Sequence, residues 1–205
     1  MSFYNFAVKL IKIIFTLFNG RPKVIGLDRI PQDQRLIFAA THRSLTDPFF
    51  LADILYPKPI AFMAKESLFK PTWFGNILKK GLVFPVNREK PAASTIKYAA
   101  NLLKNDQANL GIFPSGTRHS TEIKGGTAFI QKLAKVSIVP IAIQPPIGFW
   151  QFISRKKAKI AIGHPIPYDP DRSTKEDLAL IDLQIAQAFD QLDKELDPTY
   201  RYIPK

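Results

Sequence analysis

The stretch Arg35-Leu-Ile-Phe-Ala-Ala-Thr41 is a short apolar run that leads directly into His42. Continuous apolar runs of this length are typical of strands that are covered on both faces. A helical pattern, Asp47 to Leu55, follows a few residues later. The stretch therefore predicts a strand, a turn and a helix in direct succession, which is the repeating unit of an α/β fold.

The same alternation continues along the chain. Further apolar runs predict strands at 59–64, 82–86, 108–113, 137–143 and 159–163. Helical patterns are found at 72–80, 92–104, 125–135 and 174–196. Ser173 and Glu176 are expected to form a capping box at the start of the last helix. The order predicts an α/β domain over residues 21–205, with a mixed, largely parallel sheet covered by helices on both faces.

The first 20 residues have a different character. The segment from Phe3 to Phe18 is apolar, and its polar residues recur at helical spacing, at Asn5, Lys9, Lys12 and Thr16. It is shorter than the roughly 20 apolar residues of a transmembrane helix, and no signal-peptide cleavage site follows it. The pattern favours an amphipathic helix over residues 1–20 that lies in a membrane interface. The alternative is an ordinary helix that faces the core.

Charge and composition limit the classes of partner. Lys and Arg number 29 against 17 Asp and Glu, a net charge of +12, and 46% hydrophobic residues exclude a disordered chain. Such a basic chain favours phosphate-bearing partners, either nucleic acid or anionic lipid. A nucleic-acid partner is not expected, because no reading helix or pattern of stacking aromatics is evident. The chain has no cysteine, and His119 and His164 lack metal-ligand spacing with His42, so no metal site is predicted.

His42 and Asp47 form the first candidate site. The turn between a strand and a helix is where sites collect in α/β sheets, and a histidine there can act as a general base. If His42 lies in the turn and Asp47 in the first helical turn, the carboxylate can orient the imidazole. The alternative is structural, because Ser44 and Asp47 also match a capping box.

The run Gly111-Ile-Phe-Pro-Ser-Gly-Thr-Arg118 forms the second candidate site. The planar fork of Arg118 suits a phosphate, and Gly116 would let the backbone approach a ligand closely. Thr117 adds a hydroxyl group. The run lacks the Gly-Lys-Thr/Ser of a nucleotide-binding P-loop, and an ordinary exposed loop is the alternative reading.

Two more basic residues follow predicted strands. Lys65 ends the strand at 59–64, and Arg88 follows the strand at 82–86. In a parallel sheet, His42, Lys65, Arg88 and Arg118 would all lie beyond the carboxyl ends of strands. This convergence predicts one cationic site around His42.

Taken in order, these segments resemble the glycerolipid acyltransferase family, in particular its bacterial 1-acyl-sn-glycerol-3-phosphate acyltransferases. His42 and Asp47 match the H-x-x-x-x-D block of the family. The second block matches Gly81 to Arg88, the third, F-P-E-G-T-R, matches Phe113 to Arg118, and the fourth matches Ile138-Val-Pro-Ile141. The departure is Ser115, because the family usually has a glutamate there that is assigned to acceptor binding or site architecture.

The resemblance implies transfer of a fatty acyl group from acyl-CoA or acyl-carrier protein to the free sn-2 hydroxyl of 1-acyl-sn-glycerol-3-phosphate, giving phosphatidic acid. It implies that His42 is the general base and that Asp47 supports it. The acceptor phosphate would be bound by the cationic and loop residues Arg118, Arg88, Lys65, Thr117 and Gly116. The thioester is a co-substrate, and no cofactor is implied.

The amphipathic N-terminal segment and the basic charge lead us to expect a peripheral or monotopic protein on an anionic membrane surface, at the cytoplasmic face of the cell membrane. Two alternatives stay open at this point. One is an acyltransferase that acts on another lysolipid acceptor, and the other is a basic membrane-surface binding module without catalysis.

Overall fold

A single mixed sheet organises the chain, of which the computed structural model describes residues 2–87, 92–105 and 107–204. Within these residues, seven strands follow the order β1-β7-β6-β2-β5-β3-β4. Neighbouring strands are parallel except for the antiparallel pair β6 and β7. The strands are β1 (Lys23–Ile25), β2 (Ile37–Ala40), β3 (Ile60–Lys65), β4 (Val83–Val86), β5 (Asn109–Ile112), β6 (Ile138–Gln144) and β7 (Lys159–Ile162). The predicted mixed, largely parallel sheet is confirmed.

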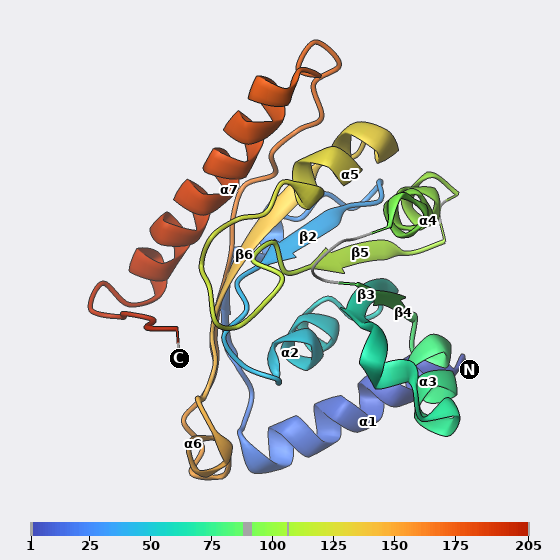
Figure 1. Ribbon diagram of the computed structural model, residues 1–205. Helices are drawn as coiled ribbons and strands as arrows, with labels where there is room; N and C mark the ends of the chain where they lie inside the picture. The colour runs from blue at the N-terminus through green and yellow to red at the C-terminus, as the bar shows by residue number, and fades with distance from the viewer. Residues whose placement is uncertain (1, 88–91, 106, 205) are drawn as a thin grey trace.

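Helices cover both faces of the sheet, as predicted (Figure 1). Helices α1, α2 and α3 lie on one side of it, and α4, α5 and α7 lie on the other (Figure 1). The α-helices are α1 (Phe3–Phe18), α2 (Asp47–Ile54), α3 (Thr72–Lys80), α4 (Ala93–Lys104), α5 (Gly126–Ala134), α6 (Phe149–Ile153) and α7 (Lys175–Leu196). Short 3-10 turns occur at Leu27–Arg29 and Glu66–Phe69.

Strand β2 is the central strand of the sheet, and it explains the apolar run with which the fold begins. Phe38 and Ala40 point to the core formed with α1 and α2. Ile37 and Ala39 point to the core formed with α4, α5 and α7. All four residues are buried, so neither face tolerates a polar side chain and the sequence shows no alternation.

Three details of the fold differ from the sequence-based prediction. Strand β1 and helix α6 were not predicted, because three and five residues are too short to show a period. The capping box of α7 was predicted one residue too early. The Thr174 hydroxyl accepts the Asp177 N–H, and the Asp177 carboxylate accepts the Thr174 N–H.

Helix α1 has two apolar faces separated by a polar stripe. On one face Tyr4 and Val8 are buried, and the ring of Phe15 packs edge-on against Phe50 of α2 at 4.9 Å. This face makes the helix part of the core, which was the alternative reading of the segment. Lys12, on the polar stripe, pairs with Asp53 of α2 at 3.4 Å.

The second apolar face of α1 is exposed to solvent. It consists of the large side chains Phe3, Phe6, Leu10, Ile13, Ile14 and Leu17. A soluble globular surface rarely carries a continuous apolar stripe of this kind. In the part of the chain that the structure describes, no helix combines the length and the apolar character needed to cross a membrane.

Asn109 provides a test of the central sheet. Its side-chain oxygen accepts the Leu36 N–H at 3.0 Å, and its amide nitrogen donates to the Pro59 carbonyl at 3.2 Å. Asn109→Ala leaves the buried Leu36 N–H without its partner, so we expect a loss of about 1–3 kcal/mol in the free energy of unfolding. Urea denaturation measures this loss. Asn101→Ala, on the exposed face of α4, is the control, and equal effects of the two substitutions would contradict the assignment.

Candidate active site

The turn between β2 and α2 brings His42 and Asp47 into contact. The Nδ1 atom of His42 lies 3.0 Å from Oδ2 of Asp47. Strand β2 ends two residues before His42, and α2 begins at Asp47 itself. The histidine thus lies in the turn and the aspartate in the first helical turn. This is the geometry that the sequence-based prediction required.

The carboxylate of Asp47 also holds the backbone of the turn. Its Oδ2 atom accepts the N–H groups of Arg43 at 2.6 Å and Ser44 at 2.7 Å, and the side chain is fully buried. Asp47 is the first residue of α2 and not the third, and the Ser44 hydroxyl accepts a bond from the Thr46 N–H. Ser44 and Asp47 thus do not form the predicted alternative, a capping box whose aspartate contacts only the start of the helix. Asp47 also contacts the imidazole of His42.

The imidazole of His42 is held on a second side by Phe113. The two rings stack with centroids 4.3 Å apart and planes inclined by 24°. Because a carboxylate can only accept hydrogen bonds, Nδ1 carries the proton and Nε2 is the unprotonated nitrogen. Nε2 makes no hydrogen bond with residues 2–87, 92–105 or 107–204. It is available to accept a proton from a ligand.

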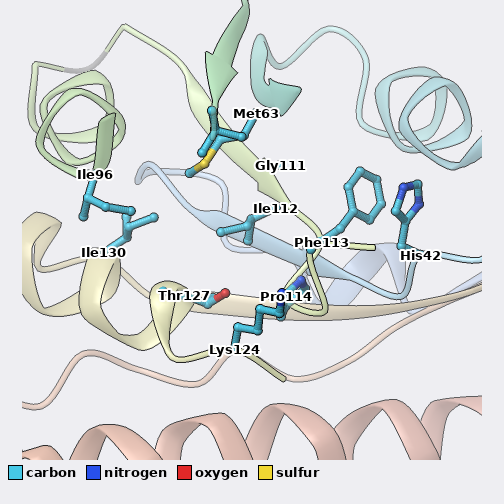
Figure 2. A pocket seen from close by; sticks show the side chains of 13 residues that line it. His42, Met63, Ile96, Gly111, Ile112, Phe113, Pro114, Lys124, Thr127 and Ile130 are labelled. Carbon is cyan, nitrogen blue, oxygen red and sulfur yellow. The ribbon is translucent and has the colours of Figure 1, made fainter. Parts of the chain in front are cut away.

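A narrow apolar pocket of about 140 Å³ opens beside His42. Figure 2 shows His42 and Phe113 at one end, with Met63, Ile96 and Ile130 at the other. Lys124 and Thr127 contribute the polar atoms of its lower wall (Figure 2). The lining suits an unbranched hydrocarbon with a polar group at the histidine end.

A glycine on β5 makes room on this side of the sheet. A Cβ atom at Gly111 would lie 2.3 Å from the ring of Phe62. Any side chain at this position would displace the Phe62 ring. That ring stacks on Phe113 with centroids 6.3 Å apart, and Phe113 in turn stacks on His42. Gly111 therefore permits the packing that orients the histidine.

The loop after β5 carries the residues predicted to bind phosphate. Gly116 has a positive φ of 67°, and its N–H donates to the Phe113 carbonyl at 2.8 Å, so it shapes the turn. The Ser115 hydroxyl donates to the Thr117 carbonyl at 2.7 Å. The half-buried side chain of Arg118 makes no hydrogen bond or ion pair with any described residue. Arg118 is thus a cation available to an anionic ligand.

Of the other residues predicted to bind phosphate, Lys65 and Thr117 do not line the pocket beside His42. Lys65 is exposed at the carboxyl end of β3 and does not line the pocket beside His42. The Thr117 hydroxyl accepts the His119 N–H at 3.2 Å. Arg88 lies outside the described residues. The parallel strand ends do converge, but of the described residues predicted to bind phosphate only Gly116 lines this pocket.

Arg43 is a residue of the site that sequence reasoning missed. Its guanidinium forms a bidentate ion pair with the carboxylate of Asp193 on α7. It also donates a hydrogen bond to the Ile143 carbonyl at 2.8 Å. Burial lowers the pKa of Arg43, but the Asp193 carboxylate more than offsets this and the pKa is raised. Arg43 is a fixed cation that anchors the turn next to His42. Its partner is 150 residues away, so no local pattern could have shown it.

A tail after α7 covers the same edge of the sheet. The guanidinium of Arg43 lies over the rings of Tyr200 and Tyr202, 5.1 Å and 5.4 Å from their centroids. The Tyr202 hydroxyl donates to the Arg118 carbonyl at 2.6 Å. The tail thereby ties the histidine turn to the Arg118 loop.

Comparisons with known proteins agree with this geometry. Residues 21–144 match the family model described as Acyltransferase. A 1-acyl-sn-glycerol-3-phosphate acyltransferase of Streptococcus pneumoniae is 37% identical over 94% of this chain and 74% of its own length. The Bacillus subtilis protein of the same name is 36% identical over 95% of this chain and 98% of its own.

A solved structure has the same fold. The crystal structure of the LPA acyltransferase PlsC from Thermotoga maritima superposes with a TM-score of 0.71 and 24% identity, over 97% of this chain and 81% of that one. The family match includes the segments that carry His42, Asp47 and Arg118. The chain therefore belongs to the acyltransferase family.

Proposed function

We propose that this enzyme transfers a fatty acyl group from an acyl thioester to the sn-2 hydroxyl of 1-acyl-sn-glycerol-3-phosphate. The observation that carries the proposal is the His42–Asp47 pair, with Nε2 available, at the mouth of an apolar pocket. The names of the two bacterial relatives support this acceptor. The donor is acyl-CoA or acyl-carrier protein.

The chemistry follows from the two nitrogens of His42. Nε2 takes the proton of the acceptor hydroxyl while that oxygen attacks the thioester carbonyl carbon. The new C–O ester bond forms, the C–S bond breaks, and the proton passes from His42 to the departing thiolate. Asp47 keeps Nδ1 protonated and stabilises the imidazolium that forms between these steps. No acyl-enzyme intermediate is required.

The donor chain and the acceptor phosphate use different parts of the site. The narrow pocket from His42 to Ile130 takes the acyl segment next to the thioester, because its walls are apolar. Arg118 binds the acceptor phosphate, because its guanidinium has no partner among the described residues and its fork fits phosphate oxygens. Lys65, at the end of β3, and Arg88, which follows β4 in the sequence, remain predicted contributors.

We also propose that α1 docks the enzyme on an anionic membrane surface as a peripheral or monotopic protein. The exposed apolar face of α1 would enter the acyl region, while Lys9 and Lys12 stay at headgroup level. A net charge of +12 adds attraction to anionic lipid. Such docking brings the site to the surface where a lysolipid resides.

His42→Ala tests the reaction itself. We expect activity to fall by a factor of about 10²–10⁴, the usual contribution of general-base catalysis. Mass spectrometry of the lipid products, with purified protein, lysophosphatidate and each thioester donor, measures the transfer. His164→Ala, at an exposed histidine, is the matched control and should keep full activity. Near-normal turnover by His42→Ala would remove the proposed mechanism.

Arg118→Ala tests the phosphate contact. We expect the acceptor KM to rise roughly ten- to hundredfold with little change in the donor KM, because hydrogen bonds to charged groups contribute about 1.5–3 kcal/mol. Steady-state kinetics with either substrate varied separates the two constants. Lys65→Ala should have a smaller effect, since Lys65 is exposed. An unchanged acceptor KM in Arg118→Ala would exclude the assignment.

The double substitution Ile13→Ser and Leu17→Ser tests membrane docking. Both side chains are on the exposed apolar face, so the fold should be retained while binding to phosphatidylglycerol vesicles drops at least tenfold. Vesicle sedimentation measures the bound fraction. Leu183→Ser, at an exposed leucine of α7, is the control. Equal binding of the double variant and the control would argue against docking through α1.

A further inference from the structure

A second apolar groove, of about 320 Å³, lies on the other side of the histidine turn. One wall is formed by Ser44 and Leu45, which follow His42 closely in the chain. The opposite wall is formed by Ile147 and Phe149, at the start of α6. Arg118 lines the same groove. The groove therefore combines an apolar channel with an available cation.

The apolar walls of the groove face solvent. The side chains of Leu45 and Phe149 are 68% and 69% exposed, although both are large and apolar. Two arginines line the groove, and Arg43 is paired with Asp193 whereas Arg118 has no partner among the described residues. Apolar residues that gather around an available cation are typical of a binding surface for an amphiphile. A soluble metabolite would not need these apolar walls.

Helix α6 is a fixed wall, because α1 holds it in place. The ring of Phe152 packs edge-on against Phe15 at 5.0 Å. The Asn19 side chain donates to the Phe152 carbonyl at 3.1 Å, and Arg155 donates to the Leu17 carbonyl at 3.1 Å. Figure 1 shows α6 beside the C-terminal end of α1. The groove thus lies beside the C-terminal end of α1.

We propose that this groove binds the acyl chain that the lysophospholipid acceptor already carries. The proposal rests on the proposed function, which fixes the acceptor at two points, its phosphate at Arg118 and its hydroxyl at His42. The acyl chain of the acceptor is attached to the same glycerol as the phosphate and the hydroxyl. It must therefore leave the site between Arg118 and His42. Arg118 and the residues after His42 line the groove, and Leu45, Ile147, Phe149 and Phe152 give it apolar walls.

The two apolar spaces then have separate occupants. The narrow pocket contains His42 and is closed by Met63, Ile96 and Ile130, so it takes the donor chain at the thioester. The groove contains Arg118, which the narrow pocket does not, so it takes the chain attached to the phosphate-bearing acceptor. The acyl chains of donor and acceptor then lie on opposite sides of the histidine turn. They do not compete for the same space.

The test compares acceptors of different chain length in detergent micelles. Wild type, Ile147→Ser and Phe149→Ser are offered 1-palmitoyl and 1-hexanoyl lysophosphatidate at saturating donor. We expect both variants to lose about tenfold in kcat/KM for the palmitoyl acceptor and less than threefold for the hexanoyl acceptor, because a short chain buries less apolar area. The donor KM should not change.

Trp150→Ser is the matched control, since Trp150 is 77% exposed on the same helix but does not line the groove. It should keep wild-type kinetics in micelles. Equal losses for both acceptors, or a loss in Trp150→Ser as large as in Phe149→Ser, would overturn the proposal and make α6 a general membrane contact.

A binding measurement separates this proposal from the reaction. In the His42→Ala background, calorimetric titration with 1-palmitoyl lysophosphatidate should give a dissociation constant that Phe149→Ser raises about tenfold. An unaltered dissociation constant would count against the groove. If wild type binds this acceptor in the groove but transfers no acyl group to it, the proposed reaction is wrong and the groove assignment stands.

Discussion

The buried carboxylate of Asp47 is the interaction on which the site depends. One oxygen accepts bonds from the His42 ring and from the N–H groups of Arg43 and Ser44. This single oxygen therefore fixes both the tautomer of the imidazole and the backbone turn that carries it. A neutral side chain of similar shape could fill the space but would not favour a positive imidazolium.

The central sheet gives this turn its surroundings. Because β2 lies between β5 and β6, the loop that carries Arg118 emerges next to His42 and the end of β6 supplies the Ile143 carbonyl to Arg43. Parallel pairing aligns these strand ends at one edge, which is where α/β proteins place their sites. His42 and the loop that carries Arg118 thus lie at the same edge of the sheet.

The parts of the structure that could be predicted from sequence are those with local patterns. The apolar run before His42 gave β2, and the five-residue spacing to Asp47 gave the pair, because strand, turn and helix are adjacent in the chain. Lys65 was expected at the site because it ends a predicted strand, yet it is exposed and does not line the pocket beside His42. The roles of Arg43 and Phe113 depend on partners far away in sequence, so no local pattern could reveal them.

The ion pair between Arg43 and Asp193 connects the region that matches the family model to a helix outside that region. The matched region ends at residue 144, whereas Asp193 lies on α7. A fragment cut to the matched region would retain His42 and Asp47 but lose Asp193, Tyr200 and Tyr202, which pair with and cover Arg43 beside the histidine. A chimera of this chain with a foreign α7 would keep the anchor of the histidine turn only if the new helix has an acidic residue at the position of Asp193.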